Sequence, residues 1–363
     1  MTISEPNILK AVARYQREYD RYLKLCARVA EICRNEIIEG NAIRAQVTFR
    51  AKSPKSLENK LRRYRITGSR EMPNVDSVFE QVRDLAAVRI ATYEQNDEDK
   101  VSAALCRRFM GNSGAEVTPD VRDKHQNSPE SFYRATHFEV YLPSSDLVGT
   151  YANVDGVPCE IQVCSMMAHV WNEIEHDLGY KPLSGVLSEL EKSMLVNLGH
   201  LSRTGDGTIS QLLAATDARH ADQTDAFTDV YDFVARIRRW FPGVDFGRNA
   251  GPLFEELQQL RLVTPAGIAS QVGDAEKIAT ISHENLVGLK VKFRARGETR
   301  YDLEENSADL LLVALLPKLA KHILSNHPTG RGVGGPTRIS WIASRFLEIE
   351  GDKKDDDAEA NLG

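Results

Sequence analysis

The sequence has no long apolar run and no targeting signal. Its longest apolar run near the C-terminus covers Leu310 to Leu316, which is much too short to cross a bilayer. The N-terminus lacks the basic-then-apolar pattern of a secretory signal. We therefore expect a cytoplasmic protein that has no membrane partner.

Cysteines are few, and basic residues are not in excess. None of the 5 cysteines forms a C-x-x-C pair: they are Cys26, Cys33, Cys106, Cys159 and Cys164. This spacing indicates neither a disulfide framework nor a thiolate zinc site. The formal net charge of -6 argues against a nucleic-acid coat, although a local basic surface remains compatible with it.

Two domains are expected, since 363 residues are too many for one ordinary core. Apolar side chains at spacings of three and four predict one long helix over residues 6–39, which ends at Gly40. Similar periodicity predicts helices at 186–202, 225–241, 253–262 and 307–325. Apolar and basic residues alternate over 289–296, before Gly297, which predicts a small β-hairpin with one basic face.

A strand should pass directly into a helix at residues 50–60. Apolar and polar side chains alternate up to Arg50, as in a half-buried strand. Ser53 suits the N-cap of the next helix and Pro54 its first position. Basic residues crowd this turn, and the free N–H groups of a first helical turn attract anions. The segment is therefore either a polyphosphate site or a solvated basic surface.

Two carboxylates stand at predicted strands in the middle of the chain. Asp84 lies at the entrance of an apolar strand that begins near Leu85. Glu160 shares the polar face of a strand over 157–163 with Gln162. Asp84 either caps a turn or binds magnesium. Together with Glu160 it would supply the two oxygen ligands that a magnesium-polyphosphate complex commonly takes from protein.

A third predicted strand, over 132–141, carries Tyr133 and His137. The two residues are an even number apart, so their side chains point to the same side of the sheet. Such a pair is either ordinary sheet surface or a place to stack a base and contact its sugar or phosphates. A helix over 166–180 follows the strand of Glu160. We expect its His169 and Glu173 on a solvated face, because H-E-x-x-H spacing is absent.

These signals occur in the order of the RelA/SpoT-type alarmone synthetase domain, which residues 42–182 resemble. The family pattern R-x-K-x-x-x-S-x-x-x-K is met by Arg50, Lys52, Ser56 and Lys60. The pattern D-L-x-x-x-R is met by Asp84, Leu85 and Arg89, and G-Y-x-x-x-H by Tyr133 and His137, with Phe132 in place of the glycine. E-I-Q-V is met over 160–163, and W-x-x-x-E-H-x-x-x-Y-K by Trp171, Glu175, His176, Tyr180 and Lys181.

The resemblance implies a pyrophosphokinase that moves the β,γ-diphosphate of ATP to a ribose 3'-hydroxyl, with Mg²⁺ as cofactor and ATP as donor. It implies that Asp84 and Glu160 hold the metal and act in catalysis. The residues implied for ATP are Arg50, Lys52, Ser56 and Lys60, and those implied for the acceptor are Tyr133, His137 and Gln162. The rim of the cleft would be lined by Arg89, Glu175, His176 and Lys181.

Two departures from the family pattern touch the acceptor side and leave the ATP residues intact. Cys164 and Ser165 stand where the family usually has Arg-Thr, which removes one basic contact to acceptor phosphates. Phe132 in place of the glycine crowds the same side.

We expect an α+β, nucleotidyltransferase-like fold in which helices flank a mixed sheet, followed by a mainly helical C-terminal domain with the small β-hairpin. The expected division is an N-terminal helix over 1–41, the synthetase domain over 42–182, a regulatory domain over 183–346 and an acidic disordered tail over 347–363.

The first functional hypothesis is synthesis of guanosine alarmones, (p)ppGpp, from ATP and GDP or GTP. An appended second domain resembles, in architecture, the small or fused toxic alarmone synthetases such as those of the CapRel type. There the synthetase pyrophosphorylates the tRNA 3' CCA end, and the C-terminal half restrains it until a phage protein is sensed. That alternative adds tRNA and a protein trigger to the partners. A third hypothesis is a catalytically inactive nucleotide sensor.

Overall fold

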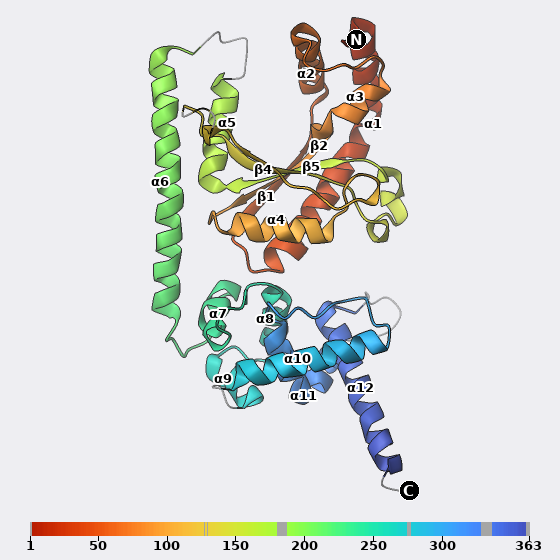
Figure 1. The fold of residues 1–363 in the computed structure, drawn as a ribbon, viewed down its shortest axis with the longest axis vertical. Coiled ribbons are helices and arrows are strands. Elements are labelled where there is room, and N and C mark those ends of the chain that lie inside the picture. Colours follow the sequence, from red (N-terminus) through yellow and green to blue (C-terminus); the bar gives the residue numbers. More distant parts are fainter. Residues whose placement is uncertain are drawn as a thin grey trace. The chain divides into compact units, whose positions relative to one another are not determined.

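The structure, a computed structural model, describes residues 2–126, 128, 130–179, 187–273, 277–327 and 336–360. The chain folds into two compact units (Figure 1). The first contains residues 1–38 and 43–212, and the second contains residues 39–42 and 213–363. The expected domain boundary at residue 182 therefore differs from the observed one, which lies inside a long helix.

The first unit combines a five-stranded sheet with helices, as expected. Its elements are α1 (Glu5–Ile32), β1 (Ala45–Ala51), α2 (Pro54–Thr67), α3 (Asp76–Gln81), β2 (Ala86–Thr92), α4 (Asp97–Arg108), β3 (Asp120–Asp123), β4 (Arg134–Val140), β5 (Cys159–Ser165), α5 (Met166–Gly179) and most of α6 (Glu189–His220). A π-helical segment, Cys33–Glu39, continues α1, so the predicted long N-terminal helix is confirmed.

The strands form one mixed sheet in the order β1-β2-β5-β4-β3. β2 and β5 run parallel, and the other neighbouring pairs are antiparallel. Helix α1 packs against β1, β2 and β5. Its buried residues share one core with apolar strand residues such as Val88, Ile161 and Phe138. Because side chains alternate along a strand, the other face of the sheet is left to polar residues.

Helix α2 begins as the sequence predicts. The Ser53 hydroxyl accepts a hydrogen bond from the Ser56 backbone N–H at 3.1 Å, and Pro54 is the first helical residue. Gly68 ends the helix with a positive φ of 64°, which glycine adopts without a Cβ penalty. The Ser53 cap and Pro54 determine where α2 begins. They thereby determine the positions of the side chains between β1 and α2.

The second unit is helical. Its elements are the end of α6, then α7 (Val230–Ile237), α8 (Ala250–Gln259), α9 (Pro265–Val272), α10 (Ile278–Ala295), α11 (Asp309–Asn326) and α12 (Arg338–Ala360). The mainly helical C-terminal domain is thus confirmed. Its core contains an aromatic cluster in which the Phe233 and Phe254 rings stack at 5.4 Å.

The predicted β-hairpin is wrong, because residues 289–295 belong to helix α10. The buried residues of α10 recur every three or four positions: Ile278, Ser282, Leu286, Leu289 and Phe293. Val291, which a strand would have buried beside Leu289, is 62% exposed. Alternation over eight residues fits either structure, and the helical period of the preceding residues decides between them.

The acidic end of the chain also differs from the expectation of a disordered tail, since α12 continues as helix to Ala360. Among the described residues, no helix is both long enough and apolar enough to cross a membrane.

Candidate active site

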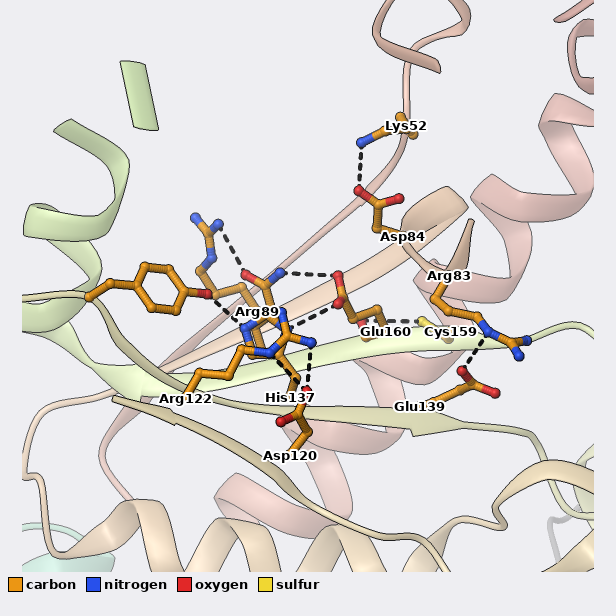
Figure 2. A network of polar contacts seen from close by, with 12 residues as sticks. Lys52, Arg83, Asp84, Arg89, Asp120, Arg122, His137, Glu139, Cys159 and Glu160 are labelled. Carbon is orange, nitrogen blue, oxygen red and sulfur yellow. Dashed lines mark hydrogen bonds and ion pairs between the residues drawn. The ribbon is translucent and has the colours of Figure 1, made fainter. Parts of the chain in front are cut away.

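Two lysines and one carboxylate meet where β1 ends and β2 begins. The Lys52 Nζ lies 2.7 Å from Asp84 Oδ2, and the Lys60 Nζ lies 2.8 Å from Asp84 Oδ1. Lys52 directly follows β1, Lys60 comes from the second turn of α2, and Asp84 comes from the short helical turn before β2. Figure 2 shows Lys52 directed toward Asp84. We call these three residues the lysine–aspartate cluster.

Charges within the lysine–aspartate cluster change the acidity of its members. Burial acts to raise the pKa of Asp84, but the charges of Lys60 and Lys52 outweigh it and lower this pKa to about 2. Burial acts to lower the pKa of Lys60, and the charge of Asp84 outweighs it, so the net pKa is raised. The cluster therefore holds two ammonium groups and one carboxylate at neutral pH, which is a setting suited to a polyphosphate and its counter-ion.

Tyr15 of α1 holds the backbone on both sides of this cluster. Its hydroxyl oxygen lies 2.7 Å from the Lys52 carbonyl and 3.1 Å from the Leu85 carbonyl. The Lys52 N–H also donates to the Leu85 carbonyl at 2.9 Å. Tyr15 is fully buried, and burial raises the pKa of its hydroxyl, so it remains a neutral donor. No sequence signal distinguished Tyr15 from the other residues of the predicted N-terminal helix.

A row of polar side chains crosses the sheet from β2 to β3. Strand register places Arg89 opposite Gln162, Gln162 opposite His137, and His137 opposite Asp120. Residues opposite one another in a sheet share a face, so these side chains form one line. Glu160 lies two residues before Gln162 on β5, paired with Glu139, and so shares the same face.

Hydrogen bonds join the row into a chain. His137 Nδ1 lies 3.0 Å from Glu160 Oε1, and the Gln162 Nε2 donates to Glu160 Oε2 at 3.1 Å. The Tyr133 hydroxyl lies 2.7 Å from His137 Nε2. Because a carboxylate can only accept, His137 Nδ1 carries a proton and donates it to Glu160. Figure 2 shows His137 and Glu160 facing each other. The predicted same-side placement of Tyr133 and His137 agrees with this contact.

Glu160 stays ionised in this setting. Burial acts to raise its pKa, as does the negative charge of Asp84, but His137 and Gln162 outweigh both and lower it. The influence of Asp84 on Glu160 means that the polar row and the lysine–aspartate cluster share one electrostatic environment.

Arg89 ends the row in contact with α5. It donates to Gln162 Oε1 at 3.4 Å and to His169 Nδ1 at 3.2 Å, and it forms an ion pair with Glu173 at 2.6 Å. Burial, with a further effect of Arg89, lowers the pKa of His169, which suits its role as acceptor. His169 and Glu173 were expected on a solvated face. Their spacing of one helical turn beside an arginine-bearing strand was the available signal.

The remaining predicted site residues lie outside this network. Arg50 and Ser56 are exposed. Glu175 is half-buried, whereas His176 is exposed, with its ring 3.8 Å from Asp177. Lys181, predicted for the rim, lies outside the described residues, as does Tyr180 of the same motif.

Phe132 packs against side chains of helices α5 and α6. Its ring is 5% exposed and packs near the rings of His125, Trp171 and His200, at centroid distances of 4.6, 6.0 and 4.9 Å. The expected crowding of the acceptor side by Phe132 is therefore directed toward α5 and α6. Cys164, the other departure, is buried with Ala135 and Ala168.

The donor set of this region fits a hard divalent cation. Asp84 and Glu160 are two carboxylates within electrostatic reach of each other, and Mg²⁺ commonly takes one or two carboxylates from protein and its other ligands from phosphates and water. No group of three or more possible metal ligands occurs among the described residues.

Comparison with known proteins identifies one sequence family. Residues 49–184 match the model described as the region found in RelA and SpoT proteins. No curated protein sequence matched the chain.

Solved structures of one enzyme, small alarmone synthetase 1 from Bacillus subtilis, are similar to this chain. The first covers 56% of this chain and 98% of its own, with 22% identity and a TM-score of 0.44. The structure bound to its product pppGpp covers 56% and 97%, with 24% identity and a TM-score of 0.42. The structure bound to AMPCPP covers 56% and 97%, with 21% identity and a TM-score of 0.40.

Proposed function

We propose that the RelA/SpoT synthetase domain within residues 49–184 transfers the β,γ-diphosphate of ATP to the ribose 3'-hydroxyl of GDP or GTP. The products would be AMP and a guanosine tetra- or pentaphosphate. The observation that carries this proposal is the joint placement of the lysine–aspartate cluster and the polar row, which offers a cationic donor site beside a chain of hydrogen-bonding acceptor groups.

The donor would bind at the lysine–aspartate cluster. Lys52 and Lys60 present two ammonium groups, and both already lie beside a carboxylate. ATP phosphates would compete for these ammonium groups and leave the Asp84 oxygens to a cation. Arg50 and Ser56, which are exposed at the same turn, would contact the rest of the nucleotide.

Asp84 and Glu160 would hold Mg²⁺, which when bound neutralises negative charge on the transferred diphosphate. Lys52 and Lys60 would stabilise the same charge from the protein side. Positioning and charge neutralisation account for most catalysis of this kind, so few side chains need to react chemically.

The acceptor would lie along the polar row. Tyr133 would stack on the base, while His137 and Gln162 contact the sugar or its phosphates. Glu160 is ionised and accepts hydrogen bonds from both. A carboxylate in that state can accept the proton of the attacking 3'-hydroxyl. Glu160 would then act as the general base.

A labelling experiment on the full-length chain tests the proposal. The chain is incubated with γ-labelled ATP and magnesium, and GDP, GTP, ATP and bulk tRNA are offered separately as acceptors. Label in guanosine tetra- or pentaphosphate supports the proposal, and a Glu160→Gln chain should lose this product. Label in tRNA alone would instead support the toxin hypothesis. Tight nucleotide binding without any transfer would indicate an inactive sensor.

A further inference from the structure

The residues on either side of Tyr133 are both held by helix α6. Phe132 precedes Tyr133 and packs on α6, and Arg134 follows it and forms an ion pair with α6. The family region ends at residue 184, before α6 begins at Glu189. The importance of these contacts rests on the proposed function, in which Tyr133 binds the acceptor.

Phe132 meets α6 at a glycine. A Cβ added to Gly199 would lie 2.2 Å from two atoms of the Phe132 ring, a distance that no side chain tolerates. Gly199 itself is buried. On the same helix the His200 ring packs edge-on against Phe132 at 4.9 Å, and the Arg203 guanidinium lies 5.2 Å from its centroid. The close approach of α6 to Phe132 therefore requires glycine at position 199.

Arg134 meets α6 in a buried polar cluster. Its Nη2 lies 2.9 Å from Glu98 Oε1, 3.2 Å from Ser165 Oγ and 3.5 Å from Asp206 Oδ2. The Ser165 hydroxyl donates to the same Asp206 oxygen at 2.9 Å. Asp206 is 6% exposed, so removing this carboxylate would leave buried donors without their acceptor.

Helix α5 adds two hydrogen bonds to this arrangement. The Trp171 Nε1 donates to the Leu195 carbonyl of α6 at 3.0 Å, and the Asn172 Nδ2 donates to the Arg134 carbonyl at 3.1 Å. Tyr133 lies just before the first residue of β4, Arg134, so strand pairing restrains only one side of it. The position of its ring therefore depends on how Phe132 and Arg134 are held.

We propose that α6 is part of the acceptor site, with Gly199 and Asp206 as positioning residues for Tyr133. The helix runs on from Leu212 into the second unit, whose first residue in this part of the chain is Leu213. The support of the acceptor site and the second unit thus share one continuous helix. Acceptor binding should respond to changes in α6 that leave the donor site intact.

The test compares two glycines of the same helix in the full-length chain. Gly199→Ala places a methyl group against Phe132, whereas Gly207→Ala meets nothing within 4 Å and serves as the matched control. Steady-state turnover gives KM for ATP and for GDP, and calorimetric titration gives Kd for GDP and for a non-hydrolysable ATP analogue. We expect Gly199→Ala to raise KM and Kd for GDP on the order of 10- to 100-fold and to leave KM for ATP and Kd for its analogue unchanged. Gly207→Ala should change neither.

A second variant and the behaviour of the wild-type chain complete the test. If Gly199→Ala does not fold, Asp206→Asn, which keeps the size of the side chain, takes its place with the same expectation. An equal loss of affinity for ATP and GDP, or no change in the affinity for either nucleotide, would overturn the inference. A wild-type chain that transfers no diphosphate but binds GDP contradicts the proposed function alone, and the Kd values then decide the role of α6. A wild-type chain that does not bind GDP contradicts both.

Discussion

The lysine–aspartate cluster and the polar row differ in how the chain builds them. The cluster joins three charged groups from segments that are close in sequence, since Lys52, Lys60 and Asp84 all lie within one strand-helix-strand passage. The row joins side chains of four strands, and its end is supported by α6, far along the chain. A site built from neighbouring segments keeps its geometry more easily than one that depends on distant elements. Acceptor choice is therefore the property that distant changes should alter first.

Removing the central carboxylate of the cluster should have the largest effect. Asp84→Asn keeps the size of the side chain but removes a proposed metal ligand and the charge that both lysines face. We expect kcat to fall on the order of 10²- to 10⁴-fold. Initial rates at saturating ATP and GDP, over a series of magnesium concentrations, measure this loss.

The same variant sharpens the comparison, because Asp84 takes no part in the hydrogen bonds of the polar row, which should be kept. Calorimetric binding of GDP to Asp84→Asn should match the wild-type chain. A parallel loss of GDP binding would show that the two regions are not separable, and would contradict the division into donor and acceptor parts.

The buried polar cluster of Arg134, Glu98, Ser165 and Asp206 predicts that the stability of the folded chain depends on pH. Burial raises the pKa of Glu98 to about 7, and the charges of Asp206 and Asp99 add to this, while Arg134 opposes it. Its ordinary value is 4.5. The folded chain therefore holds the Glu98 proton more tightly than the unfolded chain does, and stability should fall as pH rises from about 4.5 to about 7. The difference in pKa corresponds to about 3 kcal/mol.

Glu98→Gln should remove this loss, since an amide does not titrate. We expect the variant to be more stable than the wild-type chain at about pH 8 and similar to it at about pH 4. Chemical unfolding at both pH values measures the difference, and Glu116→Gln, at an exposed position, is the control. If wild-type and Glu98→Gln chains respond to pH in parallel, the pKa of Glu98 is the same in the folded and unfolded chains and the expectation is wrong.

Sequence reasoning predicted the donor region better than the acceptor region, for a physical reason. The Ser53 cap, the Pro54 start and the two lysines belong to one contiguous segment, so local rules place them. Period-two alternation put Tyr133 and His137 on one side of a strand. It could not place Glu160 beside His137, because that contact depends on the register between β4 and β5, which separate segments determine together.

Contacts between helices and strands were harder still to predict. Glu173 is exposed, as the prediction of a solvated face has it, and His169 is half-buried, but the sequence did not show that both contact Arg89 of β2. Helix α6 continues well beyond the predicted end at residue 202, and its Gly199 and Asp206 contact residues more than sixty positions earlier. Local periodicity carries no information on such packing, which tertiary structure alone decides.

Removing the Tyr15 hydroxyl of α1 should reduce kcat by less than Asp84→Asn does. Tyr15→Phe removes the hydrogen bonds to the Lys52 and Leu85 carbonyls and keeps the ring. We expect kcat to fall about fivefold, because the backbone that carries Lys52 and Asp84 loses a support worth about 1 kcal/mol. KM for GDP should stay unchanged. Tyr22→Phe is the control, since its buried ring packs on Tyr15 at 5.1 Å but its hydroxyl makes neither of these bonds.

The smallest expected effect concerns the start of α2. Ser53→Ala removes the hydroxyl that accepts from the Ser56 N–H and donates to the Ser56 hydroxyl at 2.8 Å. Loss of such a cap costs about 1 kcal/mol. Because Ser56 and Lys60 are both proposed to bind ATP, KM for ATP should rise a few-fold while KM for GDP stays constant. Ser4→Ala removes the cap of α1, whose hydroxyl accepts from Asn7 N–H at 3.4 Å, and should leave both KM values as they are. A rise in the GDP value with Ser53→Ala would mean that the first turn of α2 also supports the acceptor, and the two regions would then share more structure than their separate origins in the sequence suggest.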